Sequence, residues 1–118
     1  MPNVVIHCYS KIGDFCVLNT SSTIDHECEI GNGVHIMGGV YISGRVKIGD
    51  YVTVAGKVGI IGHLKIGDKC TIASMSQVTK SLKEGSFVSG IPARDHKTNL
   101  KLNAQLNKLD NLLNKTKK

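Results

Sequence analysis

The tripeptide Asp25-His26-Glu27 places carboxylates on both sides of an imidazole. Histidine titrates near neutral pH, and an adjacent carboxylate can hold one tautomer and raise the basicity of the ring, as a general base requires. Gly44 and Gly62 follow His26 at intervals of eighteen residues. If this spacing makes them neighbours, a strip of glycine backbone lies beside the imidazole, and its amides could stabilise an oxyanion. An isolated exposed histidine is more often only a solvent contact, and we interpret three others in that way: His7, His35 and His96.

A strict period of six residues determines what lies next to His26. Every sixth residue from Ile6 to Val78 is aliphatic, without an insertion. Neither a helical period of 3.6 nor a strand alternation of two predicts this pattern. It is typical of hexapeptide β-helices, in which each repeat supplies one short strand and three repeats make one coil. Residues eighteen apart then stack at about 4.8 Å, the spacing of neighbouring strands.

The predicted fold class is an all-β solenoid, a parallel β-helix with a C-terminal α-helix. We expect the hexapeptide-repeat β-helix over residues 4–81, a cap and turn over 82–96, and an amphipathic basic helix over 97–118. Exposed flat faces favour self-association, and three apolar helix stripes could pack around a threefold axis, so a homotrimer is expected. The helix stripe consists of Leu102, Leu106, Leu109 and Leu113.

The four cysteines do not indicate disulfides or a metal site. Cys16, Cys28 and Cys70 lie two residues before an aliphatic position, where a thiol acts as a small inward hydrophobe. Cys16 and Cys70 would lie three coils apart, roughly 14 Å, beyond disulfide reach. The sequence has neither a CxxC pair nor a cluster with metal-ligand spacing, so no metal is expected. Reduced core cysteines favour a cytoplasmic location.

Charge is concentrated at the C-terminal end. Residues 94–118 contain seven basic and two acidic residues, a net +5 of the chain's total +6. Such a helix could bind an acidic partner or present only a solvated face. Aromatic residues are few, so we expect no nucleic-acid partner. The sequence has no run of eighteen apolar residues, so no transmembrane span is predicted. The first repeat begins too close to Met1 to leave room for a signal peptide.

Several segments resemble one family of hexapeptide acyltransferases. The residues from Val58 to Asp68, including Gly62-His63-Leu64, the stretch 78–81, and the turn Ser89-Gly90-Ile91-Pro92 before the terminal helix carry the likeness. They are similar to the C-terminal half of the UDP-3-O-acylglucosamine N-acyltransferases of lipid A synthesis. The resemblance implies left-handed coils, homotrimers with active sites between subunits, and no tightly bound cofactor.

The same resemblance implies roles for individual residues. His26 would be the catalytic base, the Gly44 amide would serve the oxyanion, and His63 would be a second active-site histidine. Gly62 and Lys80 would lie on the side of the donor or its carrier. The expected reaction is transfer of a 3-hydroxyacyl group from the phosphopantetheine thioester of acyl carrier protein to the amino group of a nucleotide sugar. Acyl carrier protein is small and acidic, which suits the basic helix.

Two departures from that family open alternatives. The N-terminal nucleotide-recognition domain and earlier coils of the family have no counterpart here, and the family commonly has Ala-His-Asn where this chain has Asp25-His26-Glu27. The His-Glu-Cys order is similar to acetyl-CoA-dependent sugar acetyltransferases, in which the acidic residue after the histidine assists it. The alternatives are therefore a sugar O- or N-acetyltransferase using acetyl-CoA, and a non-catalytic trimeric scaffold that lacks an acceptor-binding domain.

Overall fold

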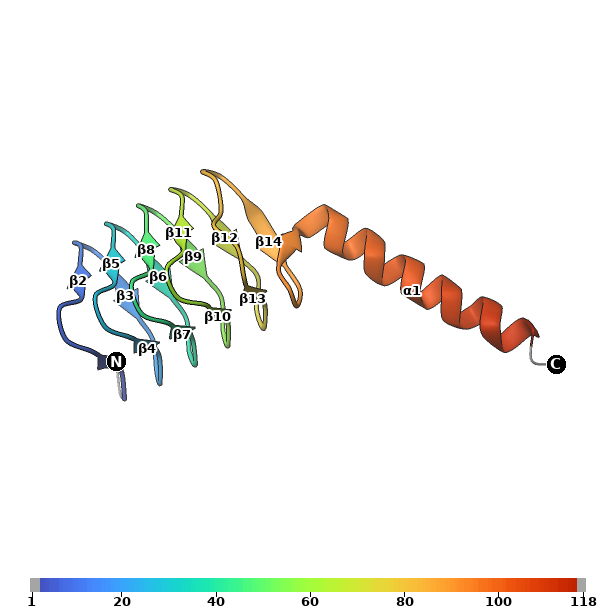
Figure 1. Cartoon of the computed structure of the whole chain (residues 1–118), viewed down its shortest axis with the longest axis horizontal. Helices are drawn as coiled ribbons and strands as arrows, with labels where there is room; N and C mark the ends of the chain where they lie inside the picture. The colour runs from blue at the N-terminus through green and yellow to red at the C-terminus, as the bar shows by residue number, and fades with distance from the viewer. Residues whose placement is uncertain (1–2, 117–118) are drawn as a thin grey trace.

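The computed structural model describes residues 3–116, and short strands recur every six residues from Val5 to Val78 (Figure 1). Within the described residues, thirteen two-residue strands each end on an aliphatic residue of the repeat, and a short hairpin and one helix follow them. The strands are β1 (Val5–Ile6), β2 (Lys11–Ile12), β3 (Val17–Leu18), β4 (Thr23–Ile24), β5 (Glu29–Ile30), β6 (His35–Ile36), β7 (Tyr41–Ile42), β8 (Lys47–Ile48), β9 (Thr53–Val54), β10 (Gly59–Ile60), β11 (Lys65–Ile66), β12 (Thr71–Ile72), β13 (Gln77–Val78), β14 (Phe87–Ser89) and β15 (Arg94–Asp95), and the helix is α1 (His96–Thr116).

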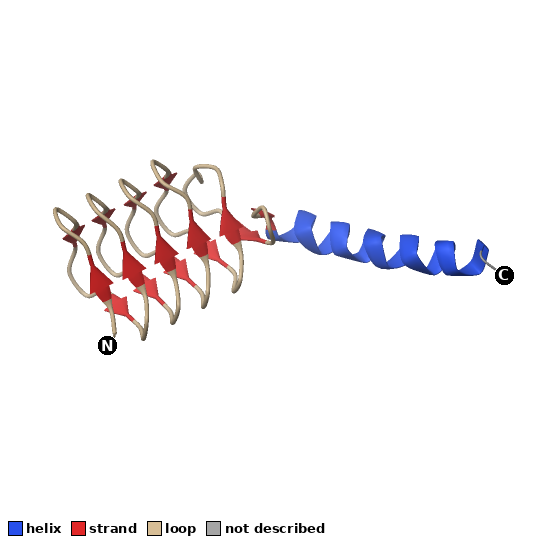
Figure 2. Ribbon diagram, turned by 60° about the horizontal axis from the view of Figure 1, so that its bottom comes forward, coloured by secondary structure: helices blue, strands red, loops and turns tan. Residues whose placement is uncertain are grey.

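The strands form three sheets that run the length of a solenoid (Figures 1 and 2). Sheet A contains β1, β4, β7, β10 and β13; sheet B contains β2, β5, β8 and β11. Sheet C contains β3, β6, β9, β12 and β14, with β15 antiparallel at its edge. Ile24 pairs with Ile6 on one side and with Ile42 on the other. The prediction that residues eighteen apart become neighbours is confirmed.

The core is a column of aliphatic side chains inside the coils. The repeat positions from Leu18 to Val78 are buried, and so are most inward residues two positions earlier, including Cys28 and Cys70. Ile6 is 45% exposed because no earlier coil in the described chain covers it. Burial of each branched side chain is worth about 1.5–3 kcal/mol, so the six-residue period supplies the main stabilisation of the fold.

The corners between sheets share one backbone conformation. The third residue after each aliphatic position up to residue 75 has a positive φ, and this includes non-glycine residues such as Glu27 (φ 56°), Arg45 (φ 61°) and His63 (φ 65°). The left-handed region is sparsely populated by such residues, but it allows the chain to turn within four residues. Backbone hydrogen bonds tie successive corners together, from Arg45 N to His26 O (2.9 Å) and from His63 N to Gly44 O (3.1 Å).

The solenoid continues past the predicted end of the repeats. Leu82 pairs with Ile66 in an isolated bridge, and β14 pairs in parallel with β12, with Val88 beside Ile72. These partners are sixteen residues apart because the corner after Val78 is two residues shorter than the others. The strict period is interrupted there, but the coil closes, so the expected boundary at residue 81 falls inside the last coil.

Helix α1 extends away from the C-terminal end of the solenoid (Figures 1 and 2). Asp95 caps it, because Oδ2 accepts hydrogen bonds from the backbone N of Thr98 (3.3 Å) and from its hydroxyl (3.4 Å). Leu106, Leu109 and Leu113 of the predicted stripe are more than half exposed. In the described residues, no helix combines the length and apolar character needed to cross a bilayer.

Candidate active site

His26 projects from the corner that joins sheet A to sheet B. Ile24 at the end of β4 and Cys28 four residues later are both fully buried, so they anchor the corner at each end. The intervening residues 25–27 must point outward. The His26 side chain is 48% exposed and that of Asp25 25% exposed, which leaves the imidazole accessible to a substrate.

Asp25 fixes the orientation of His26. Its Oδ1 lies 3.0 Å from His26 Nδ1 and also accepts a hydrogen bond from the His26 backbone N at 2.8 Å. Its Oδ2 accepts a 2.7 Å hydrogen bond from the Tyr41 hydroxyl. These bonds, that from Tyr41 foremost, hold the pKa of the Asp25 carboxyl well below its usual range. An ionised carboxylate only accepts hydrogen bonds, so the neutral ring carries its proton on Nδ1 and leaves Nε2 as an acceptor.

The His26 ring lies directly over Gly44, one coil further along. A Cβ placed on Gly44 would lie 2.8 Å from Nε2 and 3.0 Å from Nδ1 of His26. Such contacts are shorter than side chains tolerate, so only glycine leaves the ring in this position. The predicted neighbours are therefore brought together, with the acceptor nitrogen of the imidazole beside the backbone of Gly44.

The backbone N–H of Gly44 is left without a protein acceptor among residues 3–116. At the corner between sheets B and C, the equivalent N–H groups of Asp14, Asn32 and Asp50 each donate to a side-chain oxygen one coil later, at 2.8, 2.8 and 2.7 Å. The residue one coil after Gly44 is Gly62, which has no side chain to accept this bond. Gly62 thereby keeps one amide available beside His26, where it could donate to an oxyanion.

Glu27 and His63 lie in the next column of the same corner. Glu27 Oε2 is 3.4 Å from Arg45 Nε, and both side chains are about half exposed. The positive φ of Glu27 directs its side chain toward this partner, so Asp25 is the carboxylate that contacts His26. His63 follows Arg45 in the column, exposed and two coils from His26. Lys80 is exposed in the shortened corner after β13, which also joins sheet A to sheet B but lies three coils further along than His26.

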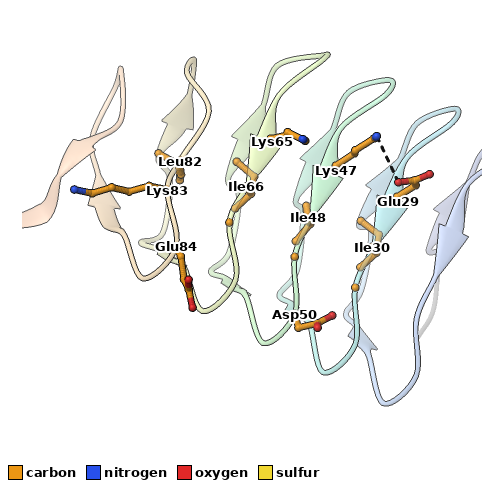
Figure 3. A pocket seen from close by; sticks show the side chains of 13 residues that line it. Glu29, Ile30, Lys47, Ile48, Asp50, Lys65, Ile66, Leu82, Lys83 and Glu84 are labelled. Atoms are coloured by element: carbon orange, nitrogen blue, oxygen red, sulfur yellow. Dashed lines mark ion pairs between the residues drawn. The ribbon is translucent and has the colours of Figure 1, made fainter.

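A groove runs along sheet B and the corner that joins it to sheet C (Figure 3). Three lysines line it, Lys47, Lys65 and Lys83, together with three carboxylates, Glu29, Asp50 and Glu84. Lys47 Nζ is 3.9 Å from Glu29 Oε2. No group of three or more His, Cys, Asp or Glu side chains in the described residues could hold a metal ion. The chemistry available at the site is therefore that of an imidazole, a carboxylate and a backbone amide.

Sequence reasoning did not identify Tyr41. Tyr41 is paired with Thr23 in sheet A, and Thr23 is two residues before Asp25. This register places the phenol on the diagonal next to Asp25, within reach of a long side chain. The eighteen-residue spacing from Thr23 to Tyr41 could have indicated this contact. Finding it would have required comparing the outward-facing residues of the sheet A strands with the residues of the adjoining corner.

Comparisons with known proteins agree with the solenoid fold. Residues 27–62 match the family model of the bacterial transferase hexapeptide (six repeats). Similar solved structures include the acetyltransferase domain of PglB from Neisseria gonorrhoeae FA1090, with 21% identity over 80% of this chain and 55% of that one, at a TM-score of 0.69. This similarity reflects the fold alone.

Two further structures are acetyltransferases of known substrate. GDP-perosamine N-acetyl transferase from Caulobacter crescentus, solved with CoA and GDP-perosamine, has 25% identity over 80% of this chain and 45% of that one, at a TM-score of 0.77. The serine acetyltransferase of Neisseria gonorrhoeae has 28% identity over 79% of this chain and 40% of that one, at a TM-score of 0.74. The chain thus spans about half or less of the length of these structures. Residues 27–62 are hexapeptide repeats of the bacterial transferase type, set in a left-handed parallel β-helix.

Proposed function

We propose that this protein is an acyltransferase that moves an acyl group from a thioester to an amino group of a sugar or nucleotide sugar. The observation that carries the proposal is the Asp25–His26 pair beside the unused amide of Gly44. His26 Nε2 accepts the proton of the attacking amine while nitrogen bonds to the thioester carbonyl carbon. The carbonyl oxygen becomes an oxyanion that accepts a hydrogen bond from Gly44 N–H. The intermediate collapses, the C–S bond breaks, and the proton on Nε2 passes to the leaving thiolate.

Acetyl-CoA is the first donor to test. The perosamine enzyme was solved with CoA, and the PglB domain was also solved with acetyl coenzyme A. His63 would contact the acceptor or the tetrahedral intermediate, and Glu27 would support the corner through Arg45. Under this proposal Gly62 acts by leaving the Gly44 amide open.

A 3-hydroxyacyl carrier protein is the second candidate donor, because residues 94–118 carry a net +5 and helix α1 extends from the solenoid. Lys80 would then add a basic contact for the carrier. The mass-spectrometric test offers each donor separately to the full chain, with UDP-glucosamine and simple amino sugars as acceptors. We expect acylated product from acetyl-CoA. Product only from the carrier protein would favour lipid A-type acylation, and no product from either donor would favour the scaffold alternative.

The exposed leucines of α1 support a homotrimer. Leu106, Leu109 and Leu113, together with the half-buried Leu102, recur at intervals of three and four residues, as in a coiled-coil seam. We expect light scattering to give three times the chain mass of 12.7 kDa. Replacing Leu106 and Leu109 with lysine should lower that mass, whereas Asn107→Lys on another face should not. A monomeric mass for the unchanged chain would contradict the assembly.

A further inference from the structure

Tyr41 makes one polar contact that bears on the site. It lies on β7 in sheet A, and its hydroxyl donates a 2.7 Å hydrogen bond to Asp25 Oδ2. The hydroxyl holds the oxygen opposite the one that faces His26. The ring is 49% exposed, so it packs only partly against its surroundings. The residue one coil later is Gly59, which supplies no side chain on that side.

We propose that Tyr41 is a positioning residue that acts on His26 through Asp25. The inference rests on the proposed function of His26 as the base. Asp25 Oδ1 accepts two hydrogen bonds from His26, one from the ring Nδ1 and one from the backbone N. Asp25 Oδ2 accepts its hydrogen bond from the Tyr41 hydroxyl. Without that bond the carboxylate is held only from the side of His26, and it can turn out of the plane of the imidazole so that neither oxygen accepts well from Nδ1. With it, the carboxylate plane is fixed at both ends, and the Nδ1–H tautomer is favoured.

The charge states of the two groups fit this role. The hydrogen bond to Asp25 raises the pKa of the Tyr41 phenol above its ordinary value, and the same contact lowers the pKa of Asp25. Tyr41 therefore remains a donor and Asp25 remains an anion throughout the neutral range. The three groups form a chain from the phenol through the carboxylate to the imidazole, in which each proton has one defined position.

The proposal differs from a packing role for an exposed tyrosine, because it depends on the hydroxyl alone. Tyr41→Phe keeps the ring and removes only the hydrogen bond. A hydrogen bond to a charged group is stronger than one between neutral groups, and partial solvation at this exposed position reduces its effect. We expect kcat to fall about tenfold, with KM unchanged within about twofold, because in this proposal Tyr41 acts on His26 through Asp25 and not on a substrate. Tyr51→Phe is the matched control, since no described residue is hydrogen-bonded to the Tyr51 hydroxyl.

Nitrogen NMR of the histidine rings provides a readout that a merely structural role would not change. Proton–nitrogen correlation spectra show which ring nitrogen of a neutral histidine is protonated, and the His26 signals are those absent from His26→Asn. We expect the Nδ1–H tautomer to dominate in the unchanged chain and in Tyr51→Phe, and to lose population in Tyr41→Phe. An unchanged tautomer ratio with unchanged kcat in Tyr41→Phe would overturn the proposal. The tautomer ratio decides the role of Tyr41 even if the unchanged chain transfers no acyl group, an outcome that would contradict only the proposed function.

Discussion

Replacing His26 with asparagine should lower the rate of acyl transfer by about 10²- to 10⁴-fold, the usual contribution of a positioned general base. Asparagine keeps a polar side chain but cannot accept the proton of the attacking amine at neutral pH. Because the imidazole is 48% exposed, its removal opens no buried cavity. The free energy of unfolding should change by no more than about 0.5 kcal/mol.

The measurement is kcat for the donor that gives product, with thermal unfolding of the same samples. His35→Asn is the matched control, because His35 is an exposed histidine on β6 in sheet C. We expect this control to retain its rate. If His26→Asn turned over substrate as fast as the unchanged chain, the assignment of His26 as the base would be lost.

Acidification tests the Asp25 carboxylate. Asp25 has a lowered pKa, so it stays ionised when the pH falls below the neutral range and remains an acceptor for the His26 ring. The folded-state pKa of Asp25 is below its unfolded value of about 3.9. Its contribution to stability is therefore present above that value and is lost as the pH falls from there through the lower folded-state pKa. Thermal unfolding measured at falling pH should show that this part of the stability is constant from neutral pH to about 4 and decreases below it.

The six-residue period was sufficient to predict most of the fold. It fixes which side chains are buried, and three repeats per coil make His26 and Gly44 neighbours although eighteen residues separate them. The last coil was missed because the corner after Val78 is two residues shorter, which shifts Leu82 out of the strict period while its pairing with Ile66 is kept. Spacing alone does not show that a coil can close over a shorter corner.

The carboxylate partner of His26 could not be chosen from the sequence. Asp25 and Glu27 are equally close to His26 along the chain, and the choice depends on the backbone at the corner. The positive φ of Glu27 turns its side chain toward Arg45, whereas Asp25 precedes the turn and reaches Nδ1 of His26. Tyr41 was missed for a related reason, since its contact crosses from one coil to the next on a diagonal.

Replacing Gly44 with alanine should reduce kcat by about 10²-fold with little loss of stability. The new Cβ would occupy space now filled by the His26 ring, with Nε2 only 2.8 Å away. The ring is exposed, so it can move aside at a cost that we expect to be about 1 kcal/mol or less. A catalytic base displaced by about 1 Å loses roughly 10²-fold in rate. The methyl group would therefore affect the chemistry far more than the fold.

Gly56→Ala is the matched control for this prediction. Gly56 occupies the same position of the repeat at the corner between sheets C and A, but a Cβ there would meet only Gly38 O at 3.5 Å, an ordinary contact. Both variants add one methyl group to an equivalent corner, and only one of them places it under an imidazole. A loss of kcat in Gly44→Ala alone, at matched thermal stability, would assign the effect to the position of His26. Equal rates in the two variants would mean that transfer does not need the ring over Gly44, and the candidate site would have to be sought elsewhere on the solenoid.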